Sequence, residues 1–462
     1  MDRYAVIWTR TATGPIKMGD LVVTERETRF SYTEEFLDSK NPSGLSLLSS
    51  PRLYGRNPVV FQTRQVFPLH PRLMQYIPGH GRGNIQRRLY TKILEKRANP
   101  PAPGFDTDWE ILLLAGRNGI GHLDIFRDDR SALEWYERPP REMISNADRS
   151  TFWQSIRDDI SQDILEMDAE KIAQLLGPTP SAGGMIPKLL VSIPDKKEWC
   201  GEFASAGIRE LNSQSYLDVI LKIEPVEYGG VVALESLCLD IHSELGFAVP
   251  RHWVAAVDGM QLLAIERFDR DQAGVPIPME SFYSVFATGD RQFNGNEDTD
   301  IEEVGVRLEK LSAAVNLDHR KARREVFRRF CVAFCTGNGD MHLDNLSFLG
   351  GPDKVRLSPV YDPAPMRAWP QHNIRSAIPI DFDGPDLAAN FIRIGTAFGM
   401  SSKGAAQVLH EILDATANYT GRVMELENVP RARKQLLVDI LSKERGELQR
   451  NLTAWGEFQG KE

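Results

Sequence analysis

Three polar side chains in the last third of the sequence have types and a spacing suited to phosphoryl transfer. Asp340 and Asn345 lie five positions apart in GNGDMHLDNLSFL, and Asp362 follows Asp340 by 22 positions in SPVYDPAPM. Phosphoryl transfer needs one carboxylate to orient or deprotonate the attacking hydroxyl, and an amide oxygen and a second carboxylate to hold Mg²⁺ against the phosphates. We therefore interpret Asp340 as a candidate base and Asn345 and Asp362 as candidate metal ligands. Single residues of these types are more often turn formers and caps, and only the ordered set favours chemistry.

A glycine-containing loop, SAGGMIPK, runs from Ser181 to Lys188. Adjacent glycines let backbone N–H groups close on phosphate oxygens, and a nearby lysine adds positive charge. The spacing is not that of a Walker A loop. A simple turn before a strand is the alternative interpretation.

Lys222 interrupts the apolar strand pattern YLDVILKIEP. A buried ammonium group needs an anionic partner, because leaving it unpaired is costly. Glu235, on the helix predicted next, is a candidate for that ion pair. The alternatives are a lysine that extends to solvent from an edge strand and a glutamate at a solvated helix position.

The elements that must position these residues fall into three parts. Residues 1–130 are rich in short strand-like runs, residues 131–275 follow a mixed α/β pattern, and residues 276–462 are mainly helical. Helical spacing is found over Asn84–Lys96, Ser150–Met167, Glu302–Ala314, Lys321–Gly337, Gly404–Thr420 and Ala432–Leu452. A mixed lobe followed by a helical lobe is the layout of a two-lobed phosphotransferase, by architectural analogy.

The composition excludes several classes of protein. The chain has 462 residues, of which 55 are Lys or Arg and 64 are Asp or Glu, so the net charge is 55 − 64 = −9. This acidic balance argues against a non-specific nucleic-acid binder. Four cysteines are too few for a disulfide scaffold, and we expect Cys331 and Cys335, one helical turn apart, to be core residues rather than metal ligands. With no signal-peptide or membrane-spanning pattern, we expect a cytoplasmic protein without a membrane partner.

Taken together, these motifs resemble HipA, the serine/threonine kinase toxin of bacterial HipA–HipB toxin–antitoxin systems. The resemblance covers most of the chain and rests on motifs that occur in order. These are GDLVVTERETRFSYTEEFL, WEILLLAGRNGIGHLDI, SAGGMIPK, IERFDR, NGDMHLDNLSFL and LSPVYD. It implies an α+β, two-lobed fold like that of protein kinases, with a mixed α/β N-terminal part and an all-helical C-terminal lobe.

The resemblance also implies roles for residues of this sequence. Asp340 would be the catalytic base, and Asn345 and Asp362 would bind Mg²⁺. Ser181 aligns with the serine whose autophosphorylation shuts the family's kinases down. The residues expected to contact ATP are Gly183, Gly184, Met185, Ile186, Pro187 and Lys188 over the phosphates, Lys222 at the phosphates, Glu266, Arg267 and Phe268 as the hinge beside adenine, and His342 and Asp344 near the nucleotide. A structural role holding the loop is the alternative for His342.

The implied partners are a HipB-like helix-turn-helix antitoxin and a protein substrate, by analogy a translation factor such as an aminoacyl-tRNA synthetase. Operator DNA would be reached only through the antitoxin. Asp344 departs from the pattern, because many relatives have lysine before the asparagine, and an acid there either adds a metal ligand or weakens catalysis. Met185 and Ile186 make the loop more apolar than in the best-known member. Two other functions remain: a kinase of small-molecule hydroxyls, and a catalytically weak co-repressor that binds the antitoxin.

Overall fold

The computed structural model describes residues 2–80, 84–137, 186, 188–211, 213–293, 295–382 and 384–459. Every structural statement below concerns these residues. The helix predicted over Ser150–Met167 lies outside them, as do Ser181, Gly183, Gly184, Met185 and Pro187 of the glycine-containing loop.

The first unit, which we call the N-terminal unit (residues 2–137), is built on a five-stranded antiparallel sheet. Its order is β4-β3-β2-β1-β5. Buried and exposed residues alternate along β3, as expected of a strand with one face on a core. The strands are β1 (Arg3–Thr11), β2 (Gly14–Val23), β3 (Thr28–Tyr32), β4 (Val59–Phe61) and β5 (Asp124–Phe126).

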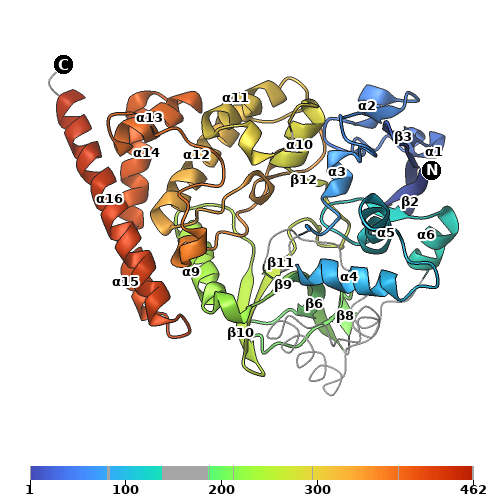
Figure 1. Cartoon of the computed structure of the whole chain (residues 1–462), viewed down its shortest axis with the longest axis horizontal. Coiled ribbons are helices and arrows are strands. Elements are labelled where there is room, and N and C mark those ends of the chain that lie inside the picture. Colours follow the sequence, from blue (N-terminus) through green and yellow to red (C-terminus); the bar gives the residue numbers. More distant parts are fainter. Residues whose placement is uncertain are drawn as a thin grey trace.

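Six helices complete the N-terminal unit. They are α1 (Glu34–Asp38), α2 (Pro51–Tyr54), α3 (Pro71–Met74), α4 (Ile85–Glu95), α5 (Phe105–Ala115) and α6 (Asp129–Tyr136). Helix α5 packs Trp109 and Leu112 on the sheet. Helix α4 lies between α5 and the second sheet (Figure 1), because Tyr90 joins the core of α5 while Leu89 joins that of the second sheet.

The second sheet is also antiparallel and has the order β10-β11-β9-β6-β7, with β8 paired to β9. Its strands are β6 (Lys188–Pro194), β7 (Ala204–Ser205), β8 (Glu210–Leu211), β9 (Gln214–Ile223), β10 (His252–Val257) and β11 (Met260–Glu266). The register places Lys188 of β6 directly opposite Lys222 of β9. Helix α9 (Val231–Glu244) packs on this sheet through Val232 and Leu239, which contact Leu263 and Ile265.

The third part is mainly helical and extends from the two sheets to the end of the molecule that α16 forms (Figure 1). Its helices are α10 (Phe282–Gly289), α11 (Ile301–Leu311), α12 (His319–Thr336), α13 (Leu387–Ala397), α14 (Ser402–Ala415), α15 (Tyr419–Glu425) and α16 (Arg431–Gln459). Its three-stranded sheet, β12-β13-β14, corrects the expectation of an all-helical lobe. The strands are β12 (Met279–Ser281), β13 (Ser347–Leu349) and β14 (Arg356–Leu357). They are too short to show a strand period in the sequence.

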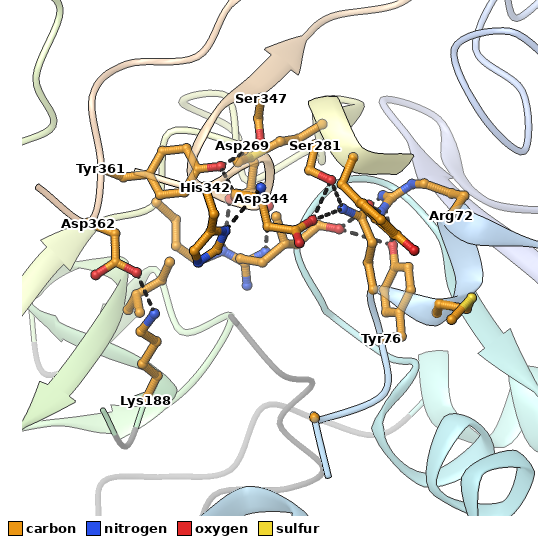
Figure 2. A pocket seen from close by; sticks show the side chains of 18 of the residues that line it. Arg72, Tyr76, Lys188, Asp269, Ser281, His342, Asp344, Ser347, Tyr361 and Asp362 are labelled. Atoms are coloured by element: carbon orange, nitrogen blue, oxygen red, sulfur yellow. Dashed lines mark hydrogen bonds and ion pairs between the residues drawn. The ribbon is translucent and has the colours of Figure 1, made fainter. Parts of the chain in front are cut away.

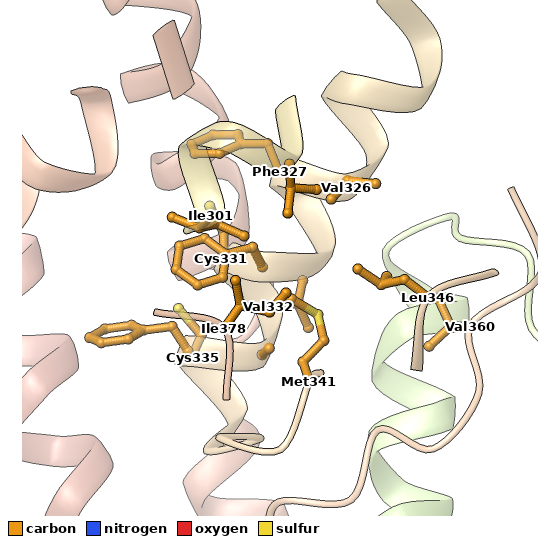
Figure 3. Packing of buried hydrophobic residues seen from close by; sticks show 14 of the residues in the cluster. Ile301, Val326, Phe327, Cys331, Val332, Cys335, Met341, Leu346, Val360 and Ile378 are labelled. Carbon is orange, nitrogen blue, oxygen red and sulfur yellow. The ribbon is translucent and has the colours of Figure 1, made fainter. Parts of the chain in front are cut away.

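Helix α12 forms the centre of the largest core (Figure 3). Phe327 and Val332 are fully buried there, and Met341 and Leu346, which directly follow Asp340 and Asn345, pack on the same cluster. Cys331 and Cys335 are buried free thiols, which confirms the prediction that they are core residues. Within the described ranges, the longest helices lack the apolar stretch that a membrane crossing requires.

Candidate active site

The segment with Asp340 and Asn345, which we call the catalytic loop (residues 337–346), begins where α12 ends. Gly337 terminates the helix in the left-handed conformation, at φ 84°. The carbonyl oxygen of Asp340 then accepts the backbone N–H of His342 at 2.8 Å and the side-chain amide of Asn345 at 2.9 Å. These bonds fold the loop back on itself, so that Asp340 and Asn345 lie close together.

Asn345 is buried, and its side-chain nitrogen is held by the carbonyl of Asp340. That bond fixes which end of the amide is nitrogen, and it turns the amide oxygen away from the loop backbone. Asp362 has φ 57°, a left-handed conformation that is uncommon for a residue with a side chain. Asn345 and Asp362 thus carry an amide oxygen and a carboxylate, which are donor types that a hard cation prefers.

Four charged side chains form a continuous network that we call the ion network. Lys222 binds Glu235 at 2.5 Å and Asp362 at 2.5 Å, and Lys188 binds the other Asp362 oxygen at 2.9 Å. The two lysines face each other on adjacent strands, where like charges repel, and the Asp362 carboxylate lies between them. Lys188, Lys222 and Glu235 are all at most 4% exposed.

The charges of the ion network shift one another's pKa values. Burial raises the pKa of Asp362, but the ammonium groups of Lys188 and Lys222 outweigh burial and hold it well below its usual range. For Lys222, burial opposes the ammonium form, yet Asp362 and Glu235 raise its pKa. Asp362 is therefore ionised and Lys222 protonated at neutral pH.

Asp340 is exposed at the edge of this site, yet protein crowds its carboxylate. That partial burial raises the pKa of Asp340 above its ordinary value, opposed by His342 and reinforced by Asp362. A carboxylate with a raised pKa is a better proton acceptor than an ordinary one.

A cavity of about 350 Å³ opens beside the ion network. Lys188, Lys222 and Asp362 line one end, and His342 lies between that end and Asp344 (Figure 2). The lining is mostly apolar: Ile220 and Ile265 of the second sheet and Phe268 contribute to its wall. A mostly apolar cavity with two lysines at one end suits a nucleotide base and its phosphates.

The predicted hinge is only partly available to a ligand. The backbone N–H of Glu266 donates to the carbonyl oxygen of Arg251, and that of Arg267 donates to the carbonyl oxygen of Asp218, each at 2.9 Å. Glu266 does not line the cavity, whereas Arg267 and Phe268 do. The guanidinium of Arg267 is held by Asp269 at 2.7 Å. A backbone N–H donated to adenine from this segment can therefore come only from Phe268.

Asp344 lines the cavity but points away from the ion network (Figure 2). Its carboxylate accepts the hydroxyl of Ser281 at 2.7 Å. Its backbone N–H donates to Nδ1 of His342 at 3.2 Å, so His342 both holds the loop and faces the cavity.

The structure thus brings Asp340, Asn345, Asp362, Lys188 and Lys222 to one region, with Glu235 behind them. Ile186 is buried in the core of the helical lobe and does not line the cavity. Several lining residues were not anticipated: Arg72, Gln75 and Tyr76 of the N-terminal unit, and Ser281 and Tyr361. Tyr361 directly precedes Asp362 in the sequence and could have been noticed. The other four residues are not part of any local motif.

The residues present fit Mg²⁺ and a nucleotide. Asn345 and Asp362 supply oxygen donors, which Mg²⁺ prefers, and Lys188 and Lys222 supply positive charge for phosphates. The described residues include no group of three His, Cys, Asp or Glu side chains able to form a metal site by themselves. Mg²⁺ in kinases is usually held by one or two protein oxygens together with the phosphates, so two donors are appropriate.

Comparison with known proteins shows which family and which relatives the chain resembles. The family model described as the HipA-like C-terminal domain matches residues 180–419, just over half of the chain. A Haemophilus influenzae protein named "Putative kinase" is 29% identical over 197 residues, covering 41% of this chain and 54% of that protein. "Putative kinase Y4dM" of Sinorhizobium fredii is 30% identical over 191 residues, covering 38% of this chain and 41% of that protein. The match thus spans about half the length of these relatives.

The fold is similar to that of HipA from Shewanella oneidensis MR-1, solved in a complex with HipB and its operator DNA. The alignment covers 94% of this chain and 95% of that one, with a TM-score of 0.62 and 16% sequence identity. The likeness therefore extends over both lobes and the N-terminal unit, well beyond the residues that the family model matches.

Proposed function

The chain belongs to the family of the HipA-like C-terminal domain, and from this premise we propose that it is an ATP- and Mg²⁺-dependent serine/threonine protein kinase of the HipA type. One observation carries the proposal. Glu235, Lys222, Asp362 and Lys188 form a continuous ion network at one end of an apolar cavity. The catalytic loop with Asp340 lies beside it. This is the arrangement that phosphoryl transfer requires.

The proposed roles follow from position. Asp340 orients the acceptor hydroxyl and takes its proton. Lys222, fixed by Glu235, contacts the phosphates, and Lys188 adds a second positive charge there. Asn345 and Asp362 would hold Mg²⁺, which when bound neutralises charge on the phosphates. Ile220, Ile265 and the backbone of Phe268 contact the base, and His342 lies beside the nucleotide.

The proposed regulation involves residues outside the described ranges. Ser181 would be autophosphorylated, and Gly183, Gly184 and Met185 would cover the phosphates. A phosphoserine adds about −1.5 to −2 charges to a loop that receives ATP phosphates, so the loop would be expelled and activity lost. We also propose division at about residues 130 and 275, cytoplasmic location, a protein target, and inhibition by a HipB-like antitoxin that alone contacts DNA.

Mass spectrometry of the purified protein, before and after incubation with Mg²⁺ and ATP, tests the proposal. We expect one added phosphate on Ser181 in the wild type and none in Asp340→Asn. Asp414→Asn, the same change at an exposed position of α14, should behave like the wild type. Nucleotide binding without phosphate on any residue would contradict self-inactivation and direct attention to small-molecule acceptors. Absence of nucleotide binding would contradict the kinase proposal.

A further inference from the structure

A hydrogen-bonded chain connects the N-terminal unit to the catalytic loop along one wall of the cavity. The Gln75 side chain accepts Nη1 of Arg72 at 2.8 Å and donates to the hydroxyl of Ser281. Ser281 donates in turn to Asp344 at 2.7 Å, and the Gln75 amide also reaches Asp344 at 3.5 Å. Figure 2 shows Arg72, Ser281 and Asp344 in this order along one wall. We call this chain the latch.

Each end of the latch is firmly anchored. Arg72 is 2% exposed and also donates to the hydroxyl of Tyr76 at 3.0 Å and the carbonyl of Ile120 at 3.1 Å. At the other end, the Asp344 carbonyl accepts the hydroxyl of Tyr361 at 2.6 Å, and its N–H is held by His342. Asp344 is one residue before Asn345, so a displacement of Asp344 moves a candidate metal ligand.

The latch also connects a buried positive charge, Arg72, to a negative charge, Asp344. Among the described residues, Arg72 forms no direct ion pair, and a buried guanidinium needs nearby negative charge. Burial raises the pKa of the nearby Glu280 carboxyl, and the Arg72 charge opposes that shift. Asp344 adds a second negative charge, which is connected to Arg72 through Gln75. In return, the hydrogen bonds from Ser281 and Gln75 hold the Asp344 carboxylate on the side of the cavity away from the ion network. The negative charge of Asp344 is thereby kept away from the place where phosphates would bind, so it does not repel them.

We propose that Gln75 is a positioning residue for phosphoryl transfer: through Ser281 it holds Asp344, and with it the catalytic loop, in place. Asp344 is then neither a metal ligand nor a phosphate contact. The N-terminal unit thus sets the turnover rate of a site that lies in the other two parts. This inference rests on the proposed kinase function, and its test separates the two.

The first variant is Gln75→Glu, in which the new carboxylate lies beside the carboxylate of Asp344 and repels it. We expect single-turnover incorporation of phosphate from Mg²⁺–ATP to fall about tenfold, the equivalent of one lost hydrogen bond to a charged group. The dissociation constant for ADP should stay within about twofold. Gln65→Ala, an exposed glutamine of the same unit, is the control and should leave both quantities unchanged.

The decisive variant is the swap Gln75→Glu with Asp344→Asn. It exchanges amide and carboxylate, so that the same hydrogen bonds can form with donors and acceptors reversed through the Ser281 hydroxyl. We expect the swap to restore incorporation to within about threefold of the wild type. A merely structural residue would not be rescued in this way. A swap as slow as Gln75→Glu alone, or an ADP constant that changes as much as the rate, would overturn the proposal.

Hydrogen exchange gives a readout that does not need activity. The backbone amides of His342, Asp344 and Asn345 are bonded within the loop and should exchange about tenfold faster in Gln75→Glu and recover in the swap. If exchange follows this pattern but the wild type incorporates no phosphate, the latch stands and the kinase function fails. If exchange is the same in all variants, the latch fails whatever the activity.

Discussion

At the scale of single residues, the site depends on one carboxylate in an unusual backbone conformation. Asp362 is left-handed at φ 57°, and each of its oxygens is held by a buried lysine. Such strain persists only where the surroundings fix the residue, and it is typical of functional positions. Lys188 and Lys222 supply that fixation, and Glu235 balances the second positive charge.

We predict that Glu235→Gln lowers the free energy of unfolding by about 3 kcal/mol, because it leaves a buried ammonium without one of its two partners. Denaturant unfolding measures the change. The matched control is Glu244→Gln on the same helix, where the carboxylate is half exposed and pairs with Arg422. It should cost less than about 1 kcal/mol, as exposed pairs do. Equal effects would show that the ion network adds nothing to stability.

Gly339, one residue before Asp340, has no room for a side chain. A Cβ atom there would lie 1.9 Å from the carbonyl oxygen of Ile374. We predict that Gly339→Ala displaces the loop by enough to slow phosphate incorporation about 100-fold, since a misplacement of about 1 Å costs that much. Gly456→Ala, in open space on α16, should keep full activity. An active Gly339→Ala would mean that the loop position is not critical.

At the scale of elements, a buried charge cluster joins the strand β11 to the N-terminal unit. Asp269 pairs with Arg267 at 2.7 Å and with Arg270 at 2.9 Å, and it accepts the N–H of Gly121 at 2.7 Å. Arg267 in turn donates to the carbonyl of Asn118 at 2.9 Å. The segment after β11 and the turn before β5 are thereby held together beside the cavity.

This cluster makes stability depend on pH. Burial raises the pKa of Asp269, but Arg267 and Arg270 outweigh it and lower the value to about 2 from 3.8. As the pH falls, the Asp269 carboxylate takes up its proton in the unfolded chain before it does so in the folded protein. The stability that the ionised carboxylate contributes is therefore complete above about pH 4 and is lost as the pH falls toward 2. The shift corresponds to about 2 kcal/mol.

We predict that Asp269→Asn is less stable than the wild type by about 3 kcal/mol at pH 7, and that this difference shrinks by about 2 kcal/mol by pH 2. Denaturant unfolding at a series of pH values measures both numbers. Asp271→Asn, exposed in the next turn, should differ from the wild type by less than about 1 kcal/mol throughout. If the difference in unfolding free energy between the wild type and Asp269→Asn does not change with pH, the charge of Asp269 does not contribute to stability.

The local elements could be predicted from the sequence because their patterns are long enough to read. The ten residues of β9 and the eighteen of α12 show clear periods. The predicted helix over Gly404–Thr420 is one exception, since α14 ends at Ala415 and α15 starts at Tyr419. β12 and β14, with three and two residues, leave no pattern to detect.

The candidate site also contains residues that could be predicted from the sequence and residues that could not. The acid, amide and lysine residues could be found because kinase chemistry fixes their types and order. Gln75 and Arg72 could not, because nothing local marks either residue. The partners of Gln75 across the cavity wall, Ser281 and Asp344, are 206 and 269 residues away in the sequence. For the predicted hinge, only packing reveals that the backbone amides of Glu266 and Arg267 already donate to other carbonyl groups.

At the scale of the whole molecule, the largest core buries three of the four thiol groups. Cys238, Cys331 and Cys335 are at most 1% exposed, and Cys200 is exposed. We predict that a colorimetric thiol reagent modifies one cysteine per chain in the native protein and all four after denaturation. Cys200→Ser should abolish the native reaction. Rapid labelling of a second thiol would show that the helical lobe opens under native conditions.

The wall that Gln75 contributes has a consequence for when the enzyme becomes active. Gln75 precedes Asp344 by 269 residues. A ribosome adding about 5–20 residues per second takes roughly a quarter of a minute to a minute to make that stretch. One wall of the cavity is therefore synthesised long before the catalytic loop that it braces. A nascent or prematurely terminated chain that ends before Gly337 has the wall but no catalytic loop. The proposed phosphorylation therefore cannot start before about three quarters of the polypeptide has been translated.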